Sequence, residues 1–513
     1  MRAMRILSIG LFLAIIGMLC GLVQDVRDAQ AIPAFARKYD FACNVCHVPG
    51  FPKLNDTGNL FRDQGYQFGM DQELPTWEGL TKGYWPVSFR TTAGYELASQ
   101  HVNGGSATTG GVWSATLDVL SFGILDRNIS YGIVFTGATA NPGNSAVVLE
   151  SVFTRLMNLE RFVGGPTNTY LMNLKVGKFE LDIPFSEKRS PTLNNSFVMY
   201  HYVPGTPFLQ TTLATLDVRN GANANGNGAG NVASYVNPNQ FQIGNNQPGI
   251  ELTGHTKTDV TGGYFRYSLA GITTNLNQGG CGTTANVNPL NNPNATGGPS
   301  SCTGSGGHGF DFYGHVTQSF GGYGIVQGQR IGAFVLAGKS PTQDNVLCPG
   351  CLGTMNNSKS FTRLGADASL TYDGQWNLFG AWMYANDSAG LFANTQTLPY
   401  QADGVTPGRF QNAVWNGGFA QLDYNPTWLQ QGKWLLSYRH DFIRNTRQGI
   451  STFADNYNNV DANTLLARYY VHQSSRTDFI VHAEFSAYTD KGVGVNGSDF
   501  RGQSMLVGFD FAF

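Results

Sequence analysis

The sequence predicts a mainly β protein, a transmembrane antiparallel β-barrel of about 16 strands that follows a short α-helical segment. Four observations predict this fold. From Trp85 onward, side chains alternate between apolar and polar over segments of about 10 to 14 residues. The final segment ends the chain on an aromatic residue, and the first 31 residues have the pattern of an export signal. Only 13% of the 513 residues are charged, which is unusual for a soluble enzyme.

The composition excludes two other classes of chain. The sequence has 34 Phe, 22 Tyr and 8 Trp with a formal net charge of -2, whereas a disordered chain has few aromatic residues and a high net charge. The near-neutral charge also gives no electrostatic reason to expect a nucleic acid as a partner. We therefore expect a large apolar fold that binds no nucleic acid.

The amino terminus has the pattern of a secretory signal peptide. Arg2 and Arg5 precede an apolar stretch at residues 6–23, and residues 29–31 are Ala-Gln-Ala, the small residues that signal peptidase recognises. We therefore predict a signal peptide over residues 1–31 and an exported mature chain. Because the apolar stretch is long, an uncleaved helical anchor stays open as an alternative.

Close to the mature amino terminus, Cys43, Cys46 and His47 form a Cys-x-x-Cys-His pattern, which is typical of covalent c-type haem attachment. On one helical turn the two thiols can reach the two vinyl groups of a porphyrin, and the adjacent imidazole becomes the proximal ligand of the iron. A zinc site would need two further ligands at matching spacing, and a redox dithiol would need a βαβ context. Neither is visible, so the sequence predicts one covalent haem c in a monohaem cytochrome segment at residues 32–83.

The sixth ligand of this haem has two candidates. Met70 follows a predicted helix at residues 54–66, and a loop could fold its thioether back over the haem. His101 is the alternative, although its neighbours are those of a polar loop. A Met70 side chain that only fills an apolar gap, and an open sixth position, also stay possible.

Residues 84–513 are predicted to form the barrel. Tight turns are expected at residues 126–128 and 373–374, and the latter is an Asp-Gly pair that tolerates positive φ. The outward face of the first strand is predicted to consist of Trp85, Val87, Phe89, Thr91, Ala93, Tyr95 and Leu97.

The carboxyl terminus separates a membrane barrel from a soluble sandwich, because alternation is common to both. One face of the last strand consists of Met505, Val507, Phe509, Phe511 and Phe513. This ending resembles the assembly signal of bacterial outer-membrane barrels, although Leu506 stands where a polar residue is usual. The sequence therefore predicts a protein of the bacterial outer membrane.

Long polar connections are predicted to face the outside of the cell. Residues 220–230 consist of Asn, Gly and Ala, and residues 275–307 are mostly Asn, Gly, Thr, Ser and Pro. Four cysteines fall in such connections, and two local disulfides are expected, with a metal site shared by the four thiols as the alternative. The expected pairs are Cys281 with Cys302 and Cys348 with Cys351.

Ionisable residues on the predicted inward faces are expected to form structural ion pairs in the lumen. An alternative for two of them, His482 and Glu484, is weak binding of a passing metal cation. The inward set consists of Arg90, Glu96, Arg363, Asp367, Arg439, Arg468, His472, His482 and Glu484.

The order of a haem segment followed directly by a barrel resembles that of the fused monohaem cytochrome-porins in the outer membranes of iron-oxidising bacteria. Over the barrel the resemblance is limited to the overall organisation, with no shared local motif. It is densest in four short motifs: Pro33-Ala34-Phe35-Ala36-Arg37, Cys43-x-x-Cys46-His47, Pro52-x-Leu54-Asn55-x-x-Gly58-x-x-Phe61 and Gly65-Tyr66.

The resemblance implies that Cys43 and Cys46 hold the haem, that His47 ligates its iron, and that ferrous iron outside the cell is the electron donor. The expected function is one-electron outer-sphere oxidation of extracellular Fe(II), with transfer to a periplasmic cytochrome or cupredoxin. Because the apolar band of such a barrel is about 25 Å tall, we expect the cytochrome segment to enter the lumen or plug its mouth.

Two other functions stay open. One is a cytochrome-porin that conducts electrons from another extracellular donor or to an extracellular acceptor, and the other is a solute-diffusion porin that carries a haem.

Overall fold

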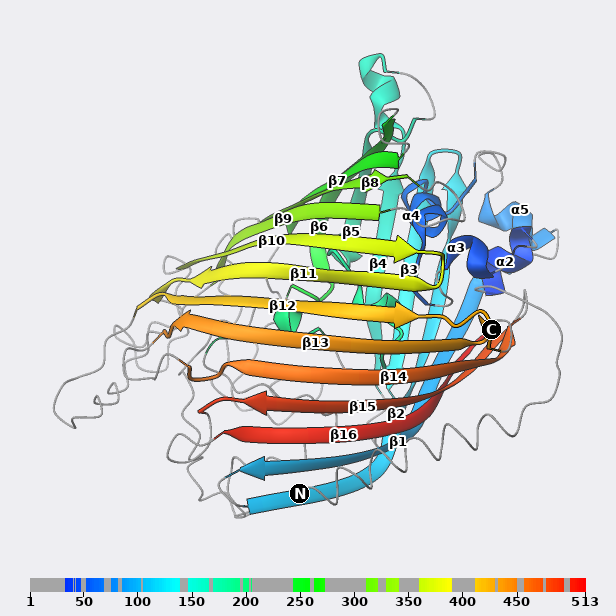
Figure 1. The fold of residues 1–513 in the computed structure, drawn as a ribbon. Coiled ribbons are helices and arrows are strands. Elements are labelled where there is room, and N and C mark those ends of the chain that lie inside the picture. Colours follow the sequence, from blue (N-terminus) through cyan, green and yellow to red (C-terminus); the bar gives the residue numbers. More distant parts are fainter. Residues whose placement is uncertain are drawn as a thin grey trace, which may run out of the picture.

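The computed structural model closes into a single antiparallel barrel (Figure 1). In the described part of the chain 16 strands follow one another around the barrel in sequence order, and β1 closes it by pairing with β16. The predictions of about 16 strands and of a mainly β fold are confirmed. The strands are β1 Val87–Val102, β2 Gly105–Asp126, β3 Ile129–Ala138, β4 Ala146–Leu156, β5 Asn173–Phe179, β6 Gln247–Thr258, β7 Gly263–Ile272, β8 Asp311–Phe320, β9 Gln329–Ser340, β10 Lys359–Tyr372, β11 Trp376–Asp387, β12 Ala413–Tyr424, β13 Trp434–Arg447, β14 Val460–Gln473, β15 Asp478–Asp490 and β16 Phe500–Ala512.

The structure describes part of the 513 residues. Signal-peptide residues 1–31, Met70, Cys281, Cys302, Cys348 and Cys351 lie outside the described residues, and so do the connections predicted at 220–230 and 275–307. The described residues are 33–39, 41, 43–47, 52–68, 75–81, 85–102, 105–138, 146–165, 169–193, 197–202, 204, 243–258, 263–272, 311–321, 329–340, 359–389, 411–429, 432–449, 456–473, 477–492 and 499–513.

The strands alternate between an apolar outer face and a buried inner face, as the sequence predicts. In β11, Leu378 and Trp382 point outward and are exposed, whereas Phe379, Ala381 and Met383 point inward and are buried. This is the period of two that a pleated strand imposes on its side chains. Closure of the barrel pairs both edges of the sheet, so every strand has two neighbours.

The longest connections and most of the short ones join strands at opposite ends of the barrel. The turn between β10 and β11 is tight because Asp373 and Gly374 both adopt positive φ, at 53° and 62°, as predicted for an Asp-Gly turn. The longest connections, residues 180–246 and 273–310, join strand ends at the other end. Short turns of outer-membrane barrels face the periplasm and long loops face outside, so the end with the short connections is the periplasmic end.

Among the residues that the structure describes, four short helices lie at the periplasmic end, beside the carboxyl terminus (Figure 1). They are α2 Pro33–Tyr39, α3 Cys43–Cys46, α4 Asp56–Asp63 and α5 Thr76–Thr81. Helix α4 is shorter than the predicted 54–66, because Gly65 and Tyr66 adopt left-handed backbone angles, with φ of 74° and 66°. Within the described ranges, no helix has the length and apolar character needed to cross a membrane.

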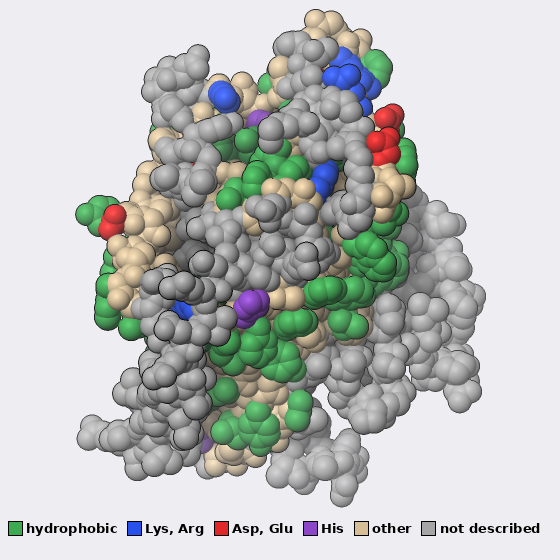
Figure 2. Space-filling view, turned by 90° about the vertical axis from the view of Figure 1, so that its right-hand side faces the viewer, with side chains coloured by type: hydrophobic (Ala, Val, Ile, Leu, Met, Phe, Trp, Pro, Cys, Tyr) green, Lys and Arg blue, Asp and Glu red, His purple; other side chains and the backbone are tan. Residues whose placement is uncertain are grey.

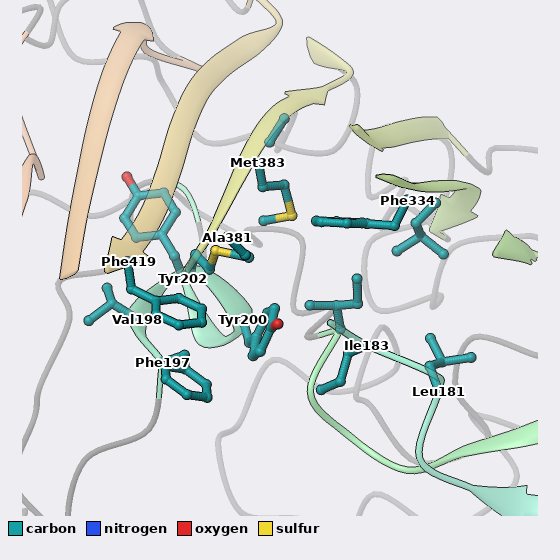
Figure 3. Close-up of a cluster of buried hydrophobic side chains, with 14 of the residues drawn as sticks. Leu181, Ile183, Phe197, Val198, Tyr200, Tyr202, Phe334, Ala381, Met383 and Phe419 are labelled. Carbon is teal, nitrogen blue, oxygen red and sulfur yellow. The ribbon is translucent and has the colours of Figure 1, made fainter. Parts of the chain in front are cut away.

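A feature that the sequence did not predict is a segment that folds into the lumen after β5. We call residues 180–193 and 197–202 the inward segment; it contains the 3-10 helix η3 Glu187–Arg189 and the helix α6 Val198–His201. A second 3-10 helix, η2 Leu159–Val163, lies in the connection between β4 and β5. The inward segment packs against the inner wall in a cluster of buried apolar side chains (Figure 3).

The predicted ion pairs on the inward faces are confirmed for Arg90, Arg363, Asp367, Arg439 and Arg468. The prediction was wrong for His472, because a register shift after Tyr470 pairs it with Phe479, whose ring packs among outward-facing aromatic residues. Asp510 binds both Arg90, at 2.9 Å, and Arg468, at 2.8 Å. Glu484 accepts a hydrogen bond from the Leu193 backbone at 2.9 Å, and no group of three or more metal-ligating side chains gathers in the described residues. Three further pairs are Arg363 with Asp387, Arg439 with Asp441, and Asp367 with His315.

Candidate functional site

A cavity of about 480 Å³ lies between the helices and the inner wall of the barrel. Its volume is in the range of small-molecule and cofactor sites. Cys46 and His47 line it, together with side chains from α2, α4 and strands β1 to β7. Figure 2 looks onto this periplasmic end, where hydrophobic side chains gather over the middle of the face and acidic ones appear at its sides.

Asn55 fixes α3 against α4. Its backbone N–H donates to the Cys46 carbonyl at 2.9 Å, and its side-chain amide donates to the Val45 carbonyl at 3.0 Å. As the N-cap of α4, its side-chain oxygen also accepts from Gly58 N at 2.9 Å, which satisfies a donor of the first helical turn. One buried side chain therefore ties the backbone of the Cys-x-x-Cys-His motif to the next helix.

Gly58 allows the close approach of these two helices. A Cβ atom added at this position would overlap the Cys46 carbonyl oxygen and crowd the Leu54 side chain. Any larger residue would push α4 away from α3. Asn55 and Gly58 both belong to the motif that carries the resemblance, and the structure gives each a physical role.

His47 is buried, with 2% of its surface exposed. Its Nδ1 lies 3.1 Å from the Lys53 carbonyl oxygen; a carbonyl only accepts, so Nδ1 carries the proton and Nε2 carries the lone pair. Burial lowers the pKa of His47 to about 4, against two backbone hydrogen bonds that raise it. A neutral imidazole whose Nδ1 donates to a carbonyl is the usual state of a histidine that ligates a metal through Nε2.

Cys46 also faces the cavity. Burial raises the pKa of its thiol to about 11, so the free side chain is a neutral thiol at physiological pH. Helix α3 includes the backbone of Cys43, but its side chain lies outside what the structure describes.

Aromatic rings form a continuous cluster along one side of the cavity. Phe61 of α4 packs against Phe35 with ring centroids 4.8 Å apart and against Phe68 at 4.7 Å. Tyr66 continues the cluster to Phe122 of β2 at 5.0 Å. Such a surface suits a large planar apolar group.

The helical segment is bound to two separate parts of the barrel wall. Ala34 N donates to Ser88 Oγ of β1 at 3.2 Å. Farther around the wall, Lys53 Nζ lies 3.1 Å from Asp423 of β12, donates to Asn377 of β11, and lies 3.6 Å from the centre of the Phe379 ring. The helices therefore span the periplasmic mouth of the barrel.

A buried ionic network joins α4, the inward segment and the wall. Arg266 of β7 pairs with Asp63 of α4 and with Asp182 of the inward segment, and Arg62 pairs with both carboxylates. Burial alone would raise the pKa of Asp63, but the Arg266 and Arg62 guanidiniums hold it well below its usual range. Other cationic side chains on the cavity wall are Arg90, Arg155, Lys175, Lys188 and Arg189.

The two candidates for a sixth ligand have different outcomes. Met70 lies outside the described residues. His101 was expected in a polar loop, but it lies in β1, paired with Ser106 and Arg501. It is 13 residues along the strand from Ser88, about 40 Å in an extended chain, so the structure does not bring it to the motif. Among the described residues that line the cavity, His47 is the only histidine and none is a methionine.

The donor set fits a covalently attached haem. The motif helix supplies Cys46 and the backbone of Cys43, His47 supplies a neutral imidazole, and the aromatic cluster with its cationic neighbours could enclose the ring and balance its carboxylates. The residues of the site outside the motif, above all Arg266 and Asp182, come from distant parts of the chain. They could not be identified from the sequence alone.

The outer surface of the barrel indicates where in the cell the protein is located. Apolar side chains cover the middle of the strands, for example Leu364 and Leu465, and Tyr372, Trp376 and Trp428 are exposed at the periplasmic end. A closed antiparallel barrel with an apolar band and an aromatic girdle is built to span the outer membrane. The chain is a bacterial outer-membrane β-barrel protein.

Comparisons with known proteins add the following. The sequence matches no protein-family model and none of the curated proteins. Among solved structures, it is similar to the outer membrane channel DcaP of Acinetobacter baumannii, with a TM-score of 0.43, 9% identity and coverage of 83% of this chain and 97% of that chain. It is also similar to OprB of Pseudomonas putida, with a TM-score of 0.42, 13% identity and coverage of 85% of this chain and 96% of that chain. A third similar structure is OmpF of Salmonella typhi in complex with daunomycin, with a TM-score of 0.42, 11% identity and coverage of 83% of this chain and 97% of that chain. These TM-scores and identities are too low to indicate the function of this chain.

Proposed function

We propose that this outer-membrane barrel protein transfers electrons from extracellular Fe(II) to a periplasmic carrier, a cytochrome or a cupredoxin, at one covalently bound haem c. The observation that carries the proposal is the position of Cys46 and His47 on an aromatic cavity of haem-like size in the periplasmic mouth. A haem c bound there supplies a single site that accepts and releases one electron.

The residues of the chain have distinct tasks in this proposal. Cys43 and Cys46 would form the two thioether bonds, and His47 would ligate the iron through Nε2. Asn55 and Gly58 hold the motif helix in place. Since His101 lies far along β1, Met70 is the candidate that is left for the distal ligand.

The proposed reaction transfers one electron for each Fe(II) ion. Each Fe(II) ion gives up one electron and leaves as Fe(III), and the electron reduces one equivalent of the periplasmic carrier. No bond to a substrate is made or broken, so the transfer is outer-sphere and the chain needs no general acid or base. The protein would thus be an Fe(II):cytochrome c oxidoreductase in type.

Titration of the purified holoprotein with Fe(II) tests this function. We expect the absorption spectrum to change to that of reduced haem c with about one equivalent of Fe(II), since one haem accepts one electron. Reduction with dithionite in a parallel sample shows that the haem is competent. If dithionite reduces the haem but excess Fe(II) leaves it oxidised at every pH from strongly acid to neutral, iron is not the donor. The chain would then be a conduit for another electron donor or acceptor.

A further inference from the structure

The inward segment crosses the lumen and is bound to the wall on many sides. At its start, the Asp182 carbonyl oxygen accepts from Tyr313 Oη of β8 at 2.7 Å, and the Pro184 carbonyl accepts from Arg330 of β9 at 2.9 Å. Each bond satisfies a backbone oxygen inside the barrel.

The later half of the segment reaches the opposite wall. Arg468 of β14 donates to the Pro191 carbonyl at 2.8 Å, and Leu193 N donates to Glu484 of β15 at 2.9 Å. Val198 N donates to Asp441 of β13 at 3.3 Å. The segment therefore forms a partition across the barrel that is hydrogen-bonded from β8 and β9 to β13, β14 and β15.

Apolar side chains fill the partition. Phe197 stacks on Phe419 of β12 with centroids 4.0 Å apart, and Phe185 packs against Phe379 of β11 at 4.7 Å. Trp415, in contact with Tyr202 at 4.7 Å, is completely buried. Figure 3 shows that side chains of the segment and of the wall point toward one another in this cluster, among them Ile183, Phe197, Tyr200, Phe334, Met383 and Phe419.

The inner face of β15 is covered and does not contact water. Along β15, every inward-facing side chain from one end of the strand to the other has 4% or less of its surface exposed. These side chains are Asp478, Ile480, His482, Glu484, Ser486, Tyr488 and Asp490. A channel filled with water would leave such side chains wet.

We propose that the inward segment closes the barrel to solutes, so that this protein is not a diffusion pore. A hydrated ion would have to shed its water to pass the partition, which costs free energy, and apolar constrictions of this kind exclude water. The inference concerns the passage of solutes and does not depend on the proposed function. If both hold, electrons cross the barrel while Fe(II) and Fe(III) stay outside.

Ion and sugar flux through liposomes that contain the holoprotein tests the closure. Flotation shows that the protein is inserted, and a reconstituted open porin is the positive control. We expect flux at least about tenfold below that of the open porin, because the apolar partition would exclude water from the lumen. Flux equal to that of the open porin would overturn the inference.

Two variants test whether the inward segment is the closure. Replacement of residues 186–200 by a short Gly-Ser linker should raise the flux to that of the open porin. Deletion of residues 220–230, which consist of Asn, Gly and Ala, is the matched control and should leave the flux low. Phe197→Ser with Phe419→Ser keeps the backbone of the segment and should also leak. If the double variant is folded and the flux stays low in both the double variant and the linker variant, the inward segment does not close the barrel.

Discussion

Replacing Cys43 and Cys46 together with Ala is expected to remove the covalently bound haem completely. The two thiols are the atoms that would form the thioether bonds, and no other Cys-x-x-Cys-His sequence exists in the chain. The mature wild-type chain should carry the added mass of one haem in intact-mass spectrometry, and the double variant should not. The effect is all or none because covalent attachment needs the thiols themselves.

The chain provides a matched control for this experiment. Cys348 and Cys351 form a second Cys-x-x-Cys pair that lacks the following histidine. Replacing both with Ala should leave the haem content unchanged. A native chain that carries zinc, or no added mass at all, would contradict the assignment of the first pair.

Replacing Arg266 with Ala is expected to lower the free energy of unfolding by about 3–5 kcal/mol, the cost of breaking a buried ion pair by removal of one partner. Arg266 is buried and pairs with Asp63 and Asp182. Without it, Arg62 shares both carboxylates. Urea titration of the protein in lipid vesicles measures the change. Arg501→Ala is the matched control, since Arg501 is 59% exposed and its pair with Asp499 should contribute less than about 1 kcal/mol.

The stability of the Arg266→Ala variant should also depend less on pH than that of the wild type. The pKa of Asp63 is below its ordinary value in the folded state, so its ion pairs contribute fully above an unfolded pKa of about 4. The contribution is lost as the pH falls through the lower, folded pKa. The difference in stability between wild type and Arg266→Ala should therefore be largest near neutral pH and shrink in strong acid. A difference that grows as the pH falls would contradict the role of this network.

Much of the barrel follows from the sequence because its information is local. Alternation sets the outward and inward faces of each strand, and the Asp373-Gly374 pair specifies a tight turn. The end of the first strand was harder to predict from the sequence. Polar residues around His101 indicate a loop, but β1 continues to Val102 because its backbone pairs with β2 and β16, and pairing beyond the apolar band needs no apolar side chains.

The interior of the barrel could not be predicted in the same way. The inward segment has no clear period, and its partners are far along the chain: Leu193 and Glu484 are 291 residues apart. The network around the cavity depends on a similar separation, 203 residues between Asp63 and Arg266. The Cys-x-x-Cys-His motif was visible because its chemistry requires short, fixed spacing, whereas the walls of its cavity come from eight strands, β1 to β7 and β16.

The most direct test of electron transfer across the membrane uses liposomes that contain the holoprotein and hold an oxidised cytochrome c inside. Fe(II) is added outside, and the absorbance of the trapped cytochrome is followed. We predict that the wild-type protein reduces the trapped carrier while iron stays outside, and that His47→Ala abolishes the reduction. If wild-type protein with a full complement of haem leaves the trapped carrier oxidised under excess Fe(II), the protein does not carry electrons from iron across the membrane.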